Sequence, residues 1–179
     1  MPGLGRLGRI LEPHVSRDIP PSPPVNCVDG VLITDQFGRR PSRAPDYGAE
    51  SRALSALAHG LAANPDGVLQ TLVELVLEVC RADSAGVSIL EPGGENGVLR
   101  WHAVAGAFAA NLNGTLPRDA SPCGTVMARD AVLLFDGAER FFPDLQGVEP
   151  RIYENLLAPW HADDEAAGTL WAIKHTPEG

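Results

Sequence analysis

The spacing of the apolar residues changes once along this chain of 179 residues, near residue 81. Before that point they recur every three or four positions, which predicts two helices, over about 50–64 and 65–80. Pro65 separates the two, since proline suits the first turn of a helix and disfavours a helical residue before it. The second helix carries a wide apolar stripe, and we expect Cys80 to lie on its buried face. A helical pair therefore opens the folded part of the chain.

After this point the apolar residues alternate with small or polar ones, or run in short blocks, as in strands. We expect five strands, over 84–91, 98–106, 132–135, 156–161 and 168–175. Turn sequences join several neighbours closely enough for hairpins, so the sheet should be antiparallel. The predicted fold class is α+β, with helices on one face of the sheet and ligand-covering loops, over 107–120 and 136–155, on the other.

Residues 1–45 differ from the rest of the chain in composition. Six prolines between residues 20 and 45 interrupt any helix or strand, and the apolar residues show no sustained period. We expect this segment to be largely disordered, with only the alternating piece at 30–35 able to form a strand or dock on another surface. The domain itself is expected to span 46–175, followed by a short tail over 176–179.

The net charge of −9 is carried by the folded part, because residues 1–45 hold more arginines than acidic residues. Such an acidic body repels phosphate backbones and anionic lipids, so neither nucleic acid nor membrane is an expected partner. The most apolar run, residues 68–80, contains two glutamates and is too short to cross a bilayer. Cys27, Cys80 and Cys123 lack metal-ligand or redox spacing, which favours a reduced, cytoplasmic protein.

Four stretches together resemble the GAF domain, a sensory module related to PAS domains. They are RAPDYGAESRALSALA (43–58), RADSAGVSILE (81–91), PRDASPCGTVM (117–127) and LLAPWH…GTLWAIKH (156–175). The likeness is greatest to GAF domains at the input end of bacterial sensor histidine kinases of the HWE type. It implies a GAF/PAS-like fold, a role in two-component signal transduction, and a histidine kinase or other output domain as partner.

Such domains normally continue past the last strand into a long helix that leads to the kinase, and neither is found here before residue 179. The resemblance therefore leaves open a fragment or a stand-alone protein. Without that helix, apolar surface on the helical side of the sheet would be uncovered. We expect a homodimer through the first two helices to cover it.

Cys123 lies in the stretch Ser121-Pro122-Cys123-Gly124, which predicts the start of a short helix with Ser121 as its N-cap. Resemblance to phytochrome-type GAF domains raises the possibility of a bilin thioether, but the histidine expected after the cysteine is replaced by Gly124. Resemblance to GAF-fold methionine-sulfoxide reductases suggests a redox thiol, which needs a resolving cysteine. The third interpretation, a small residue in a pocket wall, is the one we favour, and bilin is disfavoured.

Aromatic residues on expected strands and loops suit the wall of a pocket for a small planar or apolar ligand whose identity is unknown. The candidate pocket residues are Trp101, Arg118, Cys123, Phe135, Phe141, Trp160 and Trp171. Neither a catalytic constellation nor a metal site is recognised, so we expect a non-enzymatic sensory domain that binds a small molecule or relays a conformational change. A ligand-free dimerisation module, with the same aromatic residues filling a core, remains the alternative.

Overall fold

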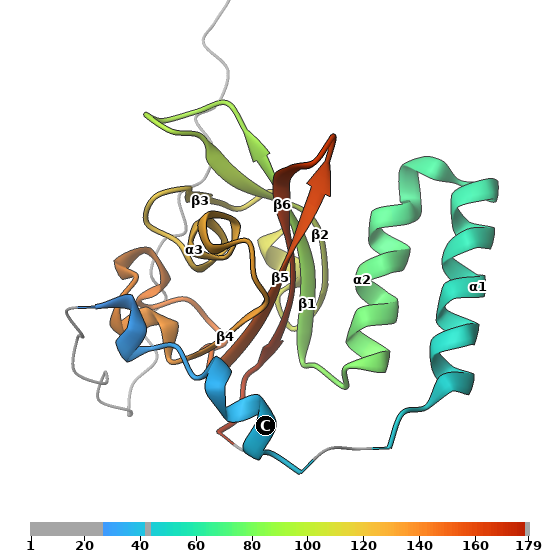
Figure 1. Ribbon diagram of the computed structural model, residues 1–179. Coiled ribbons are helices and arrows are strands. Elements are labelled where there is room, and N and C mark those ends of the chain that lie inside the picture. Colours follow the sequence, from blue (N-terminus) through green and yellow to red (C-terminus); the bar gives the residue numbers. More distant parts are fainter. Residues whose placement is uncertain (1–26, 42–43, 178–179) are drawn as a thin grey trace, which may run out of the picture.

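The computed structural model describes residues 27–41 and 44–177, which form an α+β fold built on one antiparallel sheet (Figure 1). The helices are α1 (Tyr47–Ala63), α2 (Val68–Val79) and α3 (Pro122–Arg129). The strands are β1 (Ser84–Glu91), β2 (Val98–Gly106), β3 (Thr115–Pro117), β4 (Leu133–Asp136), β5 (Glu154–Ala162) and β6 (Glu165–Lys174). Their order across the sheet is β3-β2-β1-β6-β5-β4. The predicted fold class is confirmed, and β3 is a strand that we did not expect.

The two faces of the sheet carry different layers (Figure 1). On one face α2 packs through Val73 onto the small residues Ala85 and Ala103, and α1 packs outside α2. On the other face lie α3 and the loops, which enclose the larger apolar core. None of the described helices is long and apolar enough to cross a membrane.

The helical pair begins and ends where its sequence signals indicate. Asp46 caps α1 by accepting a hydrogen bond from the Ala49 N–H at 2.9 Å, and Pro65 follows the end of that helix. The expectation for Cys80 was wrong, because its side chain is exposed. Helix α2 ends at Val79 and the chain turns at Arg81, whose φ is 51°. The last two residues of the apolar stripe, Val79 and Cys80, are therefore exposed.

Residues 27–41, here called the edge segment, pack along the outer side of β4. The Ile33 N–H donates to the Leu134 carbonyl at 2.9 Å, and the Val31 side chain is fully buried in the core. These contacts cover a strand edge that would otherwise be open to pairing with another chain. Within the stretch 1–45, where we expected disorder, this part is thus attached to the sheet, and the remainder lies outside the described residues except for 44–45.

Candidate functional site: a cavity between the sheet and α3

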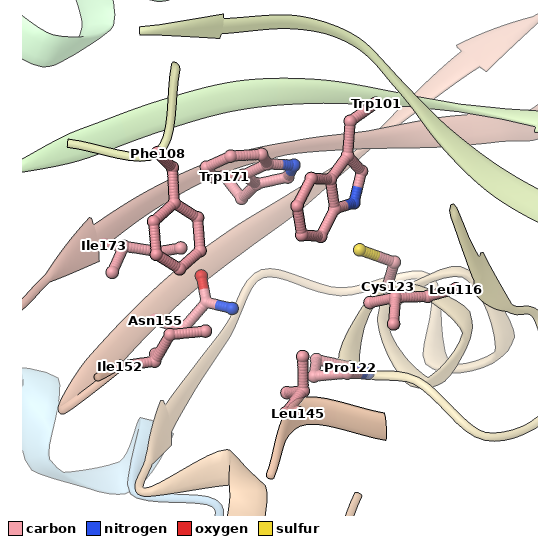
Figure 2. Close-up of a pocket in the computed structure, with 10 residues that line it drawn as sticks. All are labelled: Trp101, Phe108, Leu116, Pro122, Cys123, Leu145, Ile152, Asn155, Trp171 and Ile173. Carbon is pink, nitrogen blue, oxygen red and sulfur yellow. The ribbon is translucent and has the colours of Figure 1, made fainter. Parts of the chain in front are cut away.

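A small cavity lies on the loop side of the sheet, beside α3 (Figure 2). The space open to the centre of a water molecule is about 20 Å³, enough for one water. Residues from β2, β3, α3, β5, β6 and the intervening loops line it: Trp101, Phe108, Leu116, Pro122, Cys123, Leu145, Ile152, Asn155, Trp171 and Ile173. None of these side chains is charged, so the cavity is mainly apolar with isolated polar groups.

Three aromatic rings form the upper wall in Figure 2. Trp101 stacks on Phe108 with ring centroids 6.1 Å apart, and Trp171 meets both rings edge-on, at 5.6 and 6.4 Å. Each ring is at most 4% exposed. Such offset and edge-to-face contacts stabilise aromatic clusters beyond the burial of their area. The two indole rings, which come from strands β2 and β6, thus form the fixed part of this wall.

Ser88 organises the sheet beside this wall. The indole N–H of Trp171 donates to Ser88 Oγ at 3.0 Å, while the indole N–H of Trp160 donates to the Ser88 carbonyl at 3.2 Å. Ser88 Oγ also lies 3.7 Å from Cys123 Sγ. A bulge between Val87 and Ser88 shifts the register of β1 against β2 at this point. One buried serine thus orients two indoles and a thiol.

Asn155 is the polar group with unused hydrogen-bonding capacity. Its side chain points from β5 toward the aromatic wall (Figure 2), and the residue is only 6% exposed. Its Oδ1 has no hydrogen-bond partner among the described residues. A buried acceptor without a partner costs about 1–3 kcal/mol, so native proteins contain few such groups and each needs an explanation. The arrangement is suited to accept a hydrogen bond from a bound molecule.

Cys123 lies in the first turn of α3, where the local sequence leaves little freedom. Ser121 Oγ accepts from the Gly124 N–H at 3.1 Å, as the N-cap pattern predicts. A Cβ on Gly124 would lie 1.6 Å from the Arg118 carbonyl oxygen, so this position excludes the histidine of bilin-binding relatives. Burial raises the pKa of the Cys123 thiol. It is therefore protonated near neutral pH, contrary to the need of a nucleophile.

The structure brings three of the seven candidate residues together in the cavity: Trp101, Cys123 and Trp171. Phe135 and Phe141 belong to the adjoining core and both contact Phe142, at 6.1 and 4.9 Å between centroids. Trp160 supports Ser88 from outside the cavity. Arg118 lies in a separate surface hollow, flanked by Asn96, Asp119 and Arg129.

Sequence reasoning missed Asn155, Phe108 and the aliphatic residues of the cavity. Asn155 interrupts an apolar strand at an inward position, and a polar residue there is a signal that could have been noticed. Phe108 is the only aromatic residue in the segment expected to be irregular, 107–120. Leu145 and Ile152 come from a loop whose path no local pattern predicts.

The sequence was compared with protein families and with known structures. The family model for the GAF domain matches residues 64–178. A GAF domain from an Acinetobacter phosphoenolpyruvate-protein phosphotransferase is 16% identical, with a TM-score of 0.61 over 76% of this chain and 82% of that one. The corresponding domain from Coxiella burnetii is 19% identical, with a TM-score of 0.58 over 73% and 80%.

A third similar structure is the NreA protein from Staphylococcus aureus, described as mutated in its nitrate binding site. It is 17% identical, with a TM-score of 0.53 over 65% of this chain and 90% of that one. At such identities these likenesses establish the fold. No similar sequence was found among functionally curated proteins.

Proposed function

Because the chain belongs to the GAF domain family, a regulatory and small-molecule-binding fold, we propose that it is a non-catalytic sensory domain with its ligand in this cavity. The observation that supports this proposal most directly concerns Asn155. Its buried Oδ1 has no hydrogen-bond partner among the described residues and points toward the aromatic wall. A ligand N–H or O–H bonded to this oxygen would remove the cost of leaving it unpaired. Affinity and orientation would then come from the same contact.

The cavity lining favours a neutral, planar ligand that carries a hydrogen-bond donor. Aromatic faces suit a planar molecule, and the ten lining residues include no cation that could neutralise an anion. Nitrate, the ligand named for NreA, is therefore a useful comparison but is not the ligand class that we propose.

Ligand binding requires movement, because the cavity holds only about one water molecule as it stands. Phe108, Leu145 and Ile152 come from loops, whereas Trp101 and Trp171 are fixed on strands. We expect a ligand to favour an open packing of these loops. The shift in population between open and closed packings is the signal passed to a histidine kinase or other output partner in a two-component system.

A second copy of the chain is the proposed partner of α1. Tyr47, Leu54 and Leu61 are 73%, 70% and 55% exposed, and they recur every seven residues along one side of the helix. None of the residues of α1 is buried, and among the described elements the helix mainly contacts α2 and the short 3-10 helix Pro65–Gly67. A seven-residue apolar repeat is the spacing by which two helices pair. Leu54→Glu should convert the dimer to a monomer in light-scattering measurements, whereas Glu74→Lys on α2 should not.

The ligand proposal is tested by thermal unfolding with defined probes. Phenol and pyrazole are planar, neutral and carry a donor; benzene is planar without a donor; nitrate is a planar anion. Phenol or pyrazole should raise the melting temperature of the wild-type protein, and benzene and nitrate should do so less. Asn155→Leu should abolish the difference between phenol and benzene, while the exposed-loop control Asn96→Leu should keep it. Equal shifts for phenol and benzene in the wild type would contradict the proposal.

A further inference from the structure

A line of hydrogen bonds leads from the cavity to the residue that follows β6. The Phe108 N–H donates to Ser84 Oγ at 3.0 Å, and Ser84 Oγ lies 2.7 Å from His175 Nε2. The other ring nitrogen, His175 Nδ1, lies 2.8 Å from the Arg151 carbonyl oxygen. The rings of Phe108 and His175 are also in contact, with centroids 4.8 Å apart. Phe108 thus touches both the cavity and His175.

When the His175 ring is neutral, the partners determine the direction of every bond in this line. The Arg151 carbonyl can only accept, so His175 Nδ1 carries a proton and donates to it. In the neutral ring Nε2 then accepts, and the Ser84 hydroxyl donates to it while accepting from Phe108. Every group in the line is satisfied, and Ser84 is fully buried, so no water replaces a missing partner. The Phe108 N–H supplies the donor at one end of this line.

The two ends of the line are connected to different parts of the chain. Gly106 has φ 80°, and a Cβ there would lie 2.2 Å from the Asp83 carbonyl oxygen, so the chain leaves β2 by a close-packed bend. Phe108 follows this bend on the loop that must move for a ligand. The His175 N–H donates to the Asp83 carboxylate at 2.8 Å, where the chain leaves the sheet.

We propose that Ser84 and His175 are positioning residues that transmit movement of Phe108 to the exit of β6. This inference rests on the proposed function, because it takes loop movement as the response to a ligand. When Phe108 withdraws, the Ser84 hydroxyl loses the N–H group from which it accepts and rotates. It then no longer donates to His175 Nε2 in the same geometry. The state of the cavity thereby changes the anchoring of the chain beyond β6.

The test needs no ligand. In the full-length, 15N-labelled protein at pH 8, the Nε2 signal of His175 reports its hydrogen bond with Ser84, and amide exchange reports its anchoring. The probe of the cavity is Trp101→Phe, which removes part of the ring stacked on Phe108. We expect this change to shift the His175 Nε2 signal and raise its amide exchange about fivefold or more. In a Ser84→Ala background the same change should have less than about a twofold effect.

Ser84→Thr is the matched control, since it keeps the hydroxyl that accepts from Phe108 and lies beside His175 Nε2. The response to Trp101→Phe should persist in this background. If Ser84→Ala does not fold, His175→Leu takes its place, with amide exchange of Tyr153 as readout, because the Tyr153 N–H donates to the Lys174 carbonyl. An unchanged His175 in Trp101→Phe, or equal responses with and without the Ser84–His175 bond, would overturn the inference. Failure of the probe titrations would overturn only the ligand proposal.

Discussion

Gly86 lies directly beneath the indole ring of Trp171, its partner across β1 and β6, and a Cβ at position 86 would lie 2.1 Å from the ring. The absence of a side chain on one strand therefore makes room for the largest side chain on the other. The same ring forms part of the aromatic wall of the cavity. The shape of the site thus depends on a pair of residues, one of which does not line it.

Gly86→Ala should displace Trp171 and destabilise the domain by about 1–3 kcal/mol, because overpacking forces the ring from its position. Urea unfolding followed by tryptophan fluorescence measures this loss. Gly60→Ala, in α1, is the matched control, since a Cβ there makes only ordinary contacts, at 3.5 Å, with the Thr71 side chain of α2. It should leave stability unchanged or raise it slightly. A larger loss in Gly60→Ala than in Gly86→Ala would contradict the packing argument.

Cys123 should resist alkylation in the folded protein, because it is buried and its thiol pKa is raised by that burial. Cys27 and Cys80 are exposed and should react with iodoacetamide at pH 8, Cys80 more slowly because partial burial raises the pKa of its thiol. Mass spectrometry of the native protein should therefore show modification at no more than two sites, and a third only after denaturation. Rapid labelling of Cys123 in the folded state would reopen the redox-thiol interpretation.

Acid should weaken the hydrogen bond between the Asp83 carboxylate and the His175 N–H, which anchors the chain where it leaves β6. The backbone N–H of His175, and to a lesser extent the Lys174 side chain, lower the pKa of the Asp83 carboxyl. A lowered pKa means that the folded state favours the carboxylate, so its contribution is full above the ordinary value of 3.8 and is lost as pH falls through the folded value. Urea unfolding between pH 2.5 and 6 should show this loss in the wild type. Asp83→Asn should be less stable at pH 6 and should show less of the acid-dependent loss.

The edge segment should stabilise the domain through Val31. This side chain is fully buried against the core, so Val31→Ala should cost about 1–3 kcal/mol. Phe37 belongs to the same segment but is 44% exposed, and Phe37→Ala should cost much less. Thermal or urea unfolding distinguishes the two. Equal and small effects would mean that the edge segment does not contribute to folding.

The alternation of residues along the strands was sufficient to predict the α+β class, and the aromatic pocket candidates include Trp101 and Trp171, which line the cavity. The alternation could not predict β3, because three residues carry too little pattern, nor the burial of Val31 within a proline-rich segment. The site was less predictable than the fold. Arg118 was proposed for its charge but lies in a different hollow, and Asn155 was passed over because a single polar residue in a strand has no periodic signal. Which loop residues close a cavity depends on tertiary packing, and local sequence does not encode it.

Phenol titrated into the 15N-labelled protein tests the central claim most directly, with the side-chain amide signal of Asn155 as the readout. The account predicts that this signal and those of Phe108 and Ile152 shift together and saturate, and that benzene does not reproduce the shift of the Asn155 amide. It also predicts that the tryptophan indole signals of Asn155→Leu respond equally to the two probes. Shifts confined to surface residues, or an Asn155 signal that phenol leaves unchanged while other residues saturate, would contradict it.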